Sequence, residues 1–172
     1  MDDIKIIKLP PSRWKEYKDL RLEMLVKDPQ AFGQRYDKSI NDPDSKWQDR
    51  LKASLKQDRI IILFAEAGGK VVGTIGAFFN SDENTKNSAQ IFSVYVKENF
   101  RGMGIAKKLQ EKLLSELRSI KDLKKVRVMV NMIQSSAVNL YEQGNFRLIK
   151  TEKKLLGDGK EYEVGTMEQS LN

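Results

Sequence analysis

Apolar residues recur along this chain in two patterns, as short β-type runs and as longer runs with a helical repeat. In residues 91–96, β-branched and aromatic side chains follow one another almost without interruption, which is typical of a largely buried strand. Residues 105–120 instead place apolar side chains three and four positions apart, and this spacing predicts an amphipathic helix. Gly102 and Gly104 lie between the two segments, so the sequence predicts a strand, a tight turn and a helix at the centre of the fold.

The same two patterns predict further strands and helices on both sides of this unit. The expected strands are Ile4–Ile7, 59–67, 71–80, 125–130, 146–156 and 160–167. The expected helices are residues 13–26, a helix that follows Pro43 and carries Trp47, Leu51 and Leu55 on one face, and a helix from Ser135 or Ser136 to Gln143. Because a helix separates strands 91–96 and 125–130, we expect these two strands to be parallel, with a right-handed crossover.

Polar segments between these elements are predicted to be loops. Residues 30–41 carry few apolar side chains and are expected to form an ordered loop, and residues 81–88 a polar loop. The tail, residues 168–172, is expected to be frayed. The sequence therefore predicts one domain over residues 1–172 with an α/β (α+β) fold, in which about four helices pack on a mixed, mostly antiparallel seven-stranded sheet with a central parallel strand pair.

The composition limits the chemistry that the chain can support. It has no Cys and no His, which excludes disulfides, thiolate or imidazole metal sites and imidazole bases, so we expect no metal. No apolar run is long enough for a membrane span, and the first residues lack the core of a signal peptide, so a cytoplasmic protein is expected. The net charge of +7 and the pI near 9.5 are compatible with a nucleic acid or an anionic cofactor as ligand, or with a lysine-rich surface alone.

The glycine-bearing turn has the features of an anion site. A turn that opens a helix leaves backbone N–H groups without partners, and the positive end of the helix dipole lies at the same point. Arg101, Lys107 and Lys108 add positive charges beside this turn, and a pyrophosphate is the anion that we expect there. The alternative is that Gly102 and Gly104 only allow the chain to turn from strand to helix.

This stretch resembles the acyl-CoA-binding motif of the GNAT superfamily of N-acetyltransferases. The family motif, Gln/Arg-x-x-Gly-x-Gly/Ala between a strand and a helix, is matched by Arg101, Gly104 and Ala106. The resemblance implies that the amides from Gly102 to Ala106 hold the pyrophosphate of coenzyme A, and that the strand before them pairs with its pantetheine arm. It also implies the GNAT fold and acetyl-CoA as the cofactor. The implied cofactor-binding residues are Val94, Tyr95, Val96, Arg101, Gly102, Met103, Gly104, Ile105, Ala106, Lys107, Gln134 and Tyr141.

A second stretch, residues 134–146, resembles the other GNAT signature, Asn-x-x-Ala-x-x-x-Tyr-x-x-x-Gly-Phe. Ala137 and Tyr141 match it and lie one helical turn apart, so they face the same way. The match departs where Gln134 takes the place of the Asn, and where Asn145 is inserted before the last motif position. By resemblance, Tyr141 is the catalytic residue, a general acid for the leaving thiolate. The alternative is a tyrosine that packs against its helix and hydrogen-bonds through its hydroxyl.

The remaining catalytic groups stay open. One N–H group among Val94, Tyr95 and Val96 is expected to stabilise the negative charge that develops on the carbonyl oxygen. The sequence does not identify a general base. Glu66, Glu142 and a water relay are candidates, and each of the two acids is also typical of an ordinary surface residue. A further alternative is that the amine loses its proton before it binds.

The acceptor is expected to bind between residues 14–55 and the last hairpin, residues 148–167, because GNAT proteins usually select their substrates there. Phe32, Tyr36 and Trp47 either line this acceptor pocket or pack in the core.

The sequence thus predicts an N-acetyltransferase that moves an acetyl group from acetyl-CoA to a primary amine on a small molecule, polyamine or peptide, by direct attack in a ternary complex. We expect no nucleic acid and no membrane as partner, and the resemblance is compatible with a homodimer. Two alternatives are a GNAT-fold sensor that binds coenzyme A without catalysis and a basic nucleic-acid-binding domain. The latter predicts a basic stripe with exposed aromatic residues, whereas the aromatic residues here fall at predicted strand and helix positions.

Overall fold

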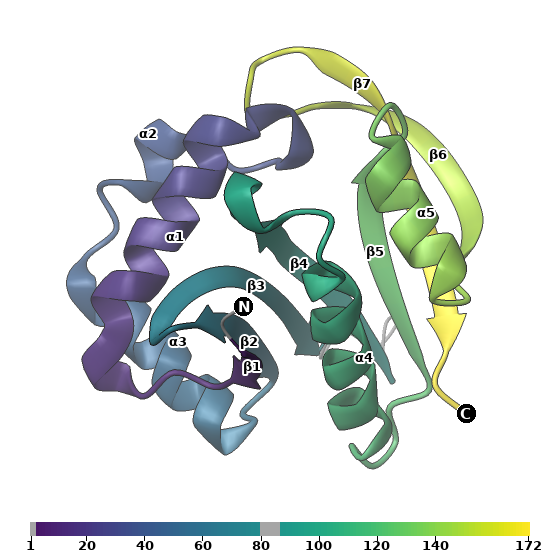
Figure 1. Ribbon diagram of the computed structural model, residues 1–172. Coiled ribbons are helices and arrows are strands. Elements are labelled where there is room, and N and C mark those ends of the chain that lie inside the picture. The colour runs from purple at the N-terminus through teal and green to yellow at the C-terminus, as the bar shows by residue number, and fades with distance from the viewer. Residues whose placement is uncertain (1–2, 80–86) are drawn as a thin grey trace.

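Seven strands form one mixed sheet in the computed structural model, which describes residues 3–79 and 87–172 (Figure 1). The strands are β1 (Ile4–Ile7), β2 (Ile60–Ala67), β3 (Lys70–Phe79), β4 (Ser88–Val96), β5 (Lys125–Asn131), β6 (Arg147–Leu155) and β7 (Glu161–Ser170). Their order across the sheet is β1-β2-β3-β4-β5-β7-β6. Neighbouring strands are antiparallel except for β4 and β5, which are parallel. This arrangement confirms the predicted fold class with its central parallel pair.

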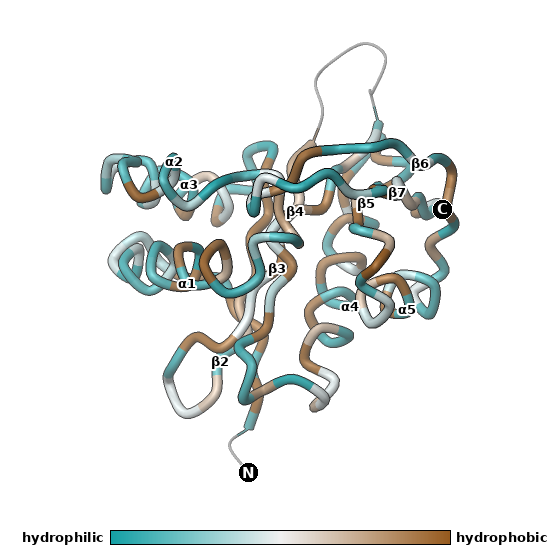
Figure 2. Tube along the Cα trace, turned by 90° about the horizontal axis from the view of Figure 1, so that it is seen from above, coloured by the Kyte–Doolittle hydropathy of each residue, from teal (hydrophilic) through white to brown (hydrophobic). Residues whose placement is uncertain are grey.

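Helices cover both faces of the sheet (Figure 2). They are α1 (Trp14–Lys27), α2 (Tyr36–Ser39), α3 (Asp44–Lys56), α4 (Ile105–Arg118) and α5 (Ser135–Gln143). Figure 2 shows α1, α2 and α3 on one side of the sheet and α4 and α5 on the other. Each side has its own apolar core, because the buried side chains of α1 and α3 cluster separately from those of α4 and α5.

The strand β2 shows how one sequence serves both cores. Side chains alternate across a strand, so a strand covered on both faces is apolar at nearly every position. Ile61 and Leu63 belong to the core under α4, whereas Ile62 and Phe64 belong to the core under α1 and α3. All four are at most 1% exposed. The helix α4 buries the predicted apolar stripe, Ile105, Leu109, Leu113 and Leu117.

The parallel pairing of β4 and β5 stops partway along both strands. It runs from Ser88 to Ile91 on β4, and the rest of β4 has no partner on that side among the described residues. On its other side, β4 pairs with β3 through a β-bulge, in which Ser93 and Val94 lie opposite the single residue Ile75. Ser93 adopts a left-handed backbone with a φ of 56°. The bulge and the lost pairing leave the end of β4 separate from β5.

Two local predictions were wrong. Residues 30–41, predicted to be a loop, contain the one-turn helix α2, which is too short to show a helical repeat in the sequence. The tail is not frayed, because β7 continues to Ser170 paired with β5, and Leu171 is buried and donates its N–H to the Lys124 carbonyl at 2.8 Å. The predicted polar loop 81–88 lies mostly outside the described residues, and its last residue, Ser88, begins β4.

The helices of residues 3–79 and 87–172 include none that is long and apolar enough to cross a membrane. The helices α1 and α4 have only 14 residues each.

Leu51 and Leu55 provide a test of the core under α3, since they lie one turn apart on the same helix. Leu51 is fully buried, whereas Leu55, which was predicted to share its face, is 47% exposed. We expect Leu51→Ala to lower the free energy of unfolding by about 2–5 kcal/mol, and Leu55→Ala to change it by only about 0.5 kcal/mol. Urea denaturation followed by circular dichroism measures both. Equal losses in the two variants would contradict this packing.

Candidate active site

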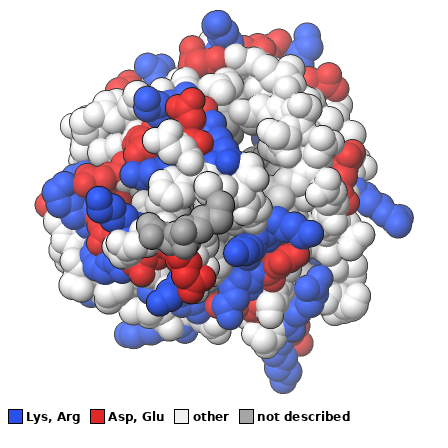
Figure 3. All heavy atoms as spheres, in the orientation of Figure 1, with Lys and Arg blue, Asp and Glu red and all other residues white. Residues whose placement is uncertain are grey.

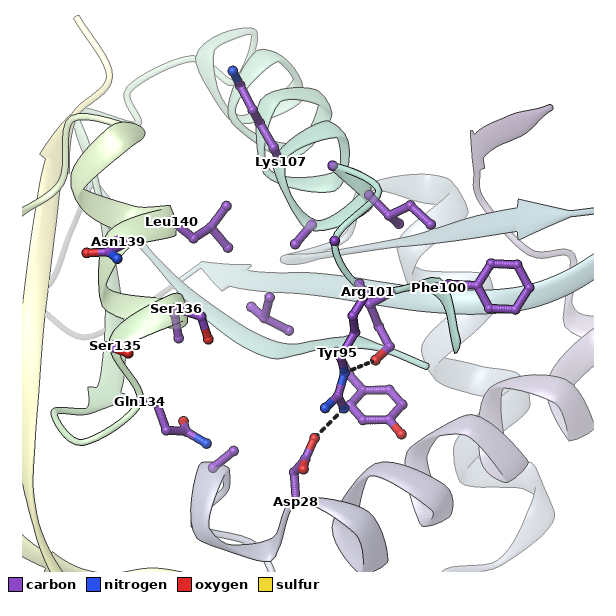
Figure 4. A pocket seen from close by; sticks show the side chains of 18 of the residues that line it. Asp28, Tyr95, Phe100, Arg101, Lys107, Gln134, Ser135, Ser136, Asn139 and Leu140 are labelled. Carbon is purple, nitrogen blue, oxygen red and sulfur yellow. Dashed lines mark hydrogen bonds and ion pairs between the residues drawn. The ribbon is translucent and has the colours of Figure 1, made fainter. Parts of the chain in front are cut away.

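An open cavity of about 830 Å³ lies beside the unpaired end of β4 (Figure 4). The turn before α4 forms one wall and the first turns of α5 form the opposite wall, so the cavity occupies the gap between the diverging strands. The segment from Asp28 to Phe32, which follows α1, contributes to the lining. We call this space the outer cavity.

The turn between β4 and α4 presents a row of free backbone amides. Gly102 and Gly104 have φ values of 76° and 74°, a left-handed conformation that favours glycine. The N–H groups from Gly102 to Lys107 donate to no acceptor among the described residues, and the first helical hydrogen bond of this turn is Lys108 N–H to the Gly104 carbonyl. The start of α4 therefore offers both unpaired donors and the positive end of a helix dipole, as an anion site requires.

The side chain of Arg101 stabilises this turn, and its positive charge is paired with a carboxylate. Its Nε donates to the Val96 carbonyl at 2.8 Å, and its Nη2 donates to the Asp28 carboxylate at 2.6 Å (Figure 4). The guanidinium also lies over the ring of Tyr95, 5.4 Å from its centroid. Burial, with a hydrogen bond to Glu23, raises the pKa of Tyr95 to about 12, so this phenol stays neutral. The positive charge expected from Arg101 is thus balanced by Asp28.

The end of β4 offers backbone hydrogen-bonding groups to the outer cavity. Lys97 donates its N–H to the Val72 carbonyl of β3, and Tyr95 pairs with Thr74 of the same strand. Because successive peptide groups alternate between the two sides of a strand, those of Val94 and Val96 face away from β3, toward the gap. Of the three residues predicted to stabilise a carbonyl oxygen, Val94 and Val96 therefore have the suitable orientation and Tyr95 does not.

A second cavity, of about 400 Å³, adjoins the first, and we call it the inner cavity. The two share Phe32, Val94, Gln134, Ala137 and Leu140 among their lining residues. The strands β4 and β5 and the end of β6 supply most of the other walls. The shared residues place the inner cavity next to the outer one, on the side away from the free amides of α4.

Tyr141 of α5 lines the inner cavity and is 4% exposed. Its ring packs edge-on against Phe146, with centroids 5.7 Å apart. No residue in the described ranges forms a hydrogen bond with its hydroxyl, and burial raises the pKa of this phenol well above its usual value of 10. A neutral phenol with a free O–H is a hydrogen-bond and proton donor, as a general acid requires.

The structure gathers nearly all the predicted cofactor-binding residues around these two cavities. Those that line the outer cavity are Val94, Tyr95, Val96, Arg101, Gly102, Gly104, Ile105, Ala106, Lys107 and Gln134. Met103 is not among the lining residues and is 47% exposed.

The two acids considered as general bases lie elsewhere. Neither acid lines the outer or the inner cavity. Glu66 is on β2 and forms an ion pair with Arg13 at 2.7 Å, and Glu142 is exposed on α5. The described residues that line the inner cavity include no carboxylate. Of the three aromatic candidates for the acceptor pocket, Phe32 lines both cavities and Trp47 is buried against Tyr17 in the core. Tyr36 is exposed and lines neither cavity.

Sequence reasoning missed several lining residues. Ser135, Ser136 and Asn139, on the first turns of α5, line the outer cavity (Figure 4). Their position after Gln134 at a helix start was the signal that could have identified them. Asp28 and Arg21 also line the cavities, but their contacts depend on distant parts of the chain, which spacing does not encode.

Comparison with known proteins shows similarity to one family. Residues 18–146 match the model of the Acetyltransferase (GNAT) family. The N-alpha-acetyltransferase daf-31 of Caenorhabditis elegans is 29% identical over 94 residues, which are 54% of this chain and 52% of that protein. The chain thus spans about half the length of this curated relative.

Solved structures share the fold. An acetyltransferase of the GNAT family from Streptococcus pneumoniae has a TM-score of 0.86 and 18% identity, over 99% of this chain and 100% of that one. The structure of yncA from Salmonella typhimurium, a putative acetyltransferase with its cofactor acetyl-CoA, has a TM-score of 0.83 and 14% identity, over 99% of this chain and 95% of that one. Because the family match includes both the turn at Gly104 and the helix of Tyr141, we conclude that this chain belongs to the Acetyltransferase (GNAT) family.

Proposed function

We propose that this protein is an N-acetyltransferase that moves an acetyl group from acetyl-CoA to a primary amine. The observation that carries the proposal is the row of free amides at the start of α4, in a cavity that adjoins the one lined by Tyr141. Membership in the GNAT family supports it, as does the likeness in fold to a protein whose structure holds acetyl-CoA.

The outer cavity has the features that coenzyme A requires. The free amides from Gly102 to Lys107 suit its pyrophosphate, and a Cβ at Gly102 or Gly104 would meet no atom within 4 Å, so the space over the turn is open. The peptide group of Val94 and the N–H of Val96 suit the amides of the pantetheine arm, in the manner of an added strand, since only the Val96 carbonyl already has a partner, Arg101.

The bound acetyl-CoA supplies an activated acyl group, a thioester. In the proposed mechanism, an N–H of Val94 or Val96 stabilises the charge on its carbonyl oxygen. The hydroxyl of Tyr141 protonates the thiolate that leaves. Since the inner cavity has no carboxylate among its described lining residues, we propose that water accepts the proton of the amine.

The proposal is tested by titration and by turnover. We expect acetyl-CoA to bind and to raise the melting temperature, with a stabilisation that grows with the logarithm of its concentration above the Kd. Release of free thiol should then depend on an added amine. Binding without transfer to any amine would favour a sensor that binds coenzyme A, and absence of binding would contradict both functions.

The nucleic-acid alternative receives no support from the face that Figure 3 shows. Lys and Arg side chains are interspersed there with Asp and Glu and do not form a continuous basic stripe. Many are paired, as in Lys8–Glu116 at 2.7 Å.

Gly104→Ala tests the anion site. Because Gly104 has a φ of 74°, a Cβ there strains the turn, and we expect acetyl-CoA affinity to fall by at least about 10-fold. Gly159→Ala is the matched control, since Gly159 has a φ of 77° but lies in the turn between β6 and β7. Isothermal titration with coenzyme A measures both. If the two variants lost equal affinity, the effect would be global and the assignment of the turn wrong.

Tyr141→Phe tests the general acid. We expect kcat to fall by about 10²–10⁴-fold, with acetyl-CoA affinity nearly unchanged because the ring is kept. Tyr17→Phe is the control, since Tyr17 is also buried and its hydroxyl has no partner among the described residues, but it lines neither cavity. Equal turnover of wild type and Tyr141→Phe would remove the assignment.

The pH dependence of turnover follows from the environment of Tyr141. Burial raises the pKa of this phenol above 10, so the protonated form required of an acid persists at every pH below that value. The acceptor amine must instead lose its proton. We therefore expect kcat/KM to rise with pH from about 6 to about 10 without a descending limb. A decline that begins near neutral pH, absent in Tyr141→Phe, would show that the phenol ionises early.

A further inference from the structure

The inner cavity contains a buried positive charge without a counterion. Arg21 of α1 lines this cavity and is 9% exposed. Its Nη1 donates to the hydroxyl of Ser93 at 2.5 Å, and its Nη2 donates to the side-chain carbonyl of Gln34 at 2.5 Å. Its Nη1 also lies 3.8 Å from the sulfur of Met24, and the guanidinium lies over the ring of Phe32, 5.8 Å from its centroid. All of these partners are neutral, and Arg21 forms no ion pair with any described residue.

The charges around Arg21 do not neutralise it. The carboxylate of Asp42 exerts some attraction from a distance, but it is bound to Lys46 at 2.7 Å, and Arg50 repels Arg21. Burial lowers the pKa of Arg21, yet a guanidinium stays protonated in proteins. Lys154, the other cation of the inner cavity, has its own partner in Glu152 at 3.2 Å. A desolvated cation lowers the stability of the fold unless an anion binds it. The environment of Arg21 therefore favours an anionic ligand.

A purely structural role does not account for the charge. Arg21 braces the bulge of β4 through Ser93, whose φ of 56° is unusual for a non-glycine residue. A neutral amide side chain could donate the same hydrogen bond without desolvating a charge. The contacts of Nη1 with Ser93 and the Met24 sulfur and of Nη2 with Gln34 also leave Nε and one N–H of Nη2 without a partner among the described residues, so donors remain for a carboxylate.

The position of Arg21 limits what the anion is. Its partner Ser93 is the residue before Val94, where the proposed carbonyl-stabilising N–H groups begin. An acceptor amine must therefore approach the thioester within a few ångströms of Arg21. The inner cavity, at about 400 Å³, has the size of a small-molecule site. Amine and anion must then belong to one small molecule and lie a few bonds apart.

We propose that Arg21 binds the carboxylate of the acceptor, and that the acceptor is a free amino acid whose amine lies within a few bonds of that carboxylate. This inference rests on the proposed function and names its substrate class. Polyamines and aminoglycosides fit poorly, because Arg21 repels their additional cations and the described lining residues offer no carboxylate to bind them. A protein N-terminus fits only if its first side chain supplies the carboxylate.

The decisive comparison is between acids and their amides. The first measurement is binding. The protein loaded with coenzyme A is titrated with N-acetylated amino acids, which are the expected products, and with the carboxamides of these products. The second measurement is turnover, followed by thiol release. It compares as acceptors the free amino acids, their amides, diamines, and peptides that begin with Asp or Glu. For wild type we expect the acids to bind, and to react in kcat/KM, roughly 10- to 100-fold better than the amides.

Arg21→Gln should remove this preference by weakening the acids and leaving the amides nearly unchanged. Arg35→Gln is the control, since Arg35 is exposed and pairs with Asp37 at the surface. The comparison of acids with amides in wild type needs no variant, so the test stands even if Arg21→Gln folds poorly.

Each outcome decides the inference separately from the proposed function. Equal binding of acids and amides, or no binding of the acids at millimolar concentration, overturns the inference, even if some other amine is acetylated. A peptide that is preferred over every free amino acid overturns the choice of a free amino acid. Binding of the acids that depends on Arg21, without transfer to any amine, supports the anion site and overturns the proposed enzyme.

Discussion

The loss of pairing between β4 and β5 beyond Ile91 is the constraint on which the rest of the site depends. A sheet leaves no room for a ligand between two hydrogen-bonded strands. The bulge at Ser93 and Val94 ends that pairing on one side while β4 stays attached to β3 on the other. The peptide group of Val94 and the N–H of Val96 then face the gap in an otherwise complete sheet, while the Val96 carbonyl accepts from Arg101. The helices α4 and α5 provide the two walls of this gap.

The two ends of the gap offer different kinds of hydrogen-bond donor. At the open end, backbone amides and a helix dipole attract an anion without a long side chain. At the closed end lie the hydroxyl of Tyr141, which burial keeps protonated, and the guanidinium of Arg21, which stays charged although burial lowers its pKa. The glycines at positions 102 and 104 keep the first end open, and packing against Phe146 fixes the second.

Local patterns in the sequence were sufficient for the fold and for the open end of the gap. The apolar run before Gly102 and the stripe on α4 each lie within a few turns, so spacing alone identifies the strand, the turn and the helix. The position of Tyr141 on a helix also followed from its spacing to Ala137.

Contacts between distant segments could not be derived in this way. Arg101 binds Asp28, which is 73 residues away, and Arg21 binds Ser93, which is 72 residues away. The sequence therefore indicated a free charge at Arg101 where the structure has an ion pair, and it gave no indication of the buried charge at Arg21. The one-turn helix α2 was missed because four residues contain no repeat.

The helix α1 touches both ends of the gap, through Arg21 on its buried face and through Asp28 at its end. An attempt to engineer a new acceptor preference by grafting α1 together with its C-terminal cap residue, Asp28, from a relative would therefore also exchange the residue that anchors the turn before α4. A graft without an acid at position 28 would leave Arg101 unanchored. The open end of the gap, where the anion site lies, would then be altered by a change that was intended only for the closed end.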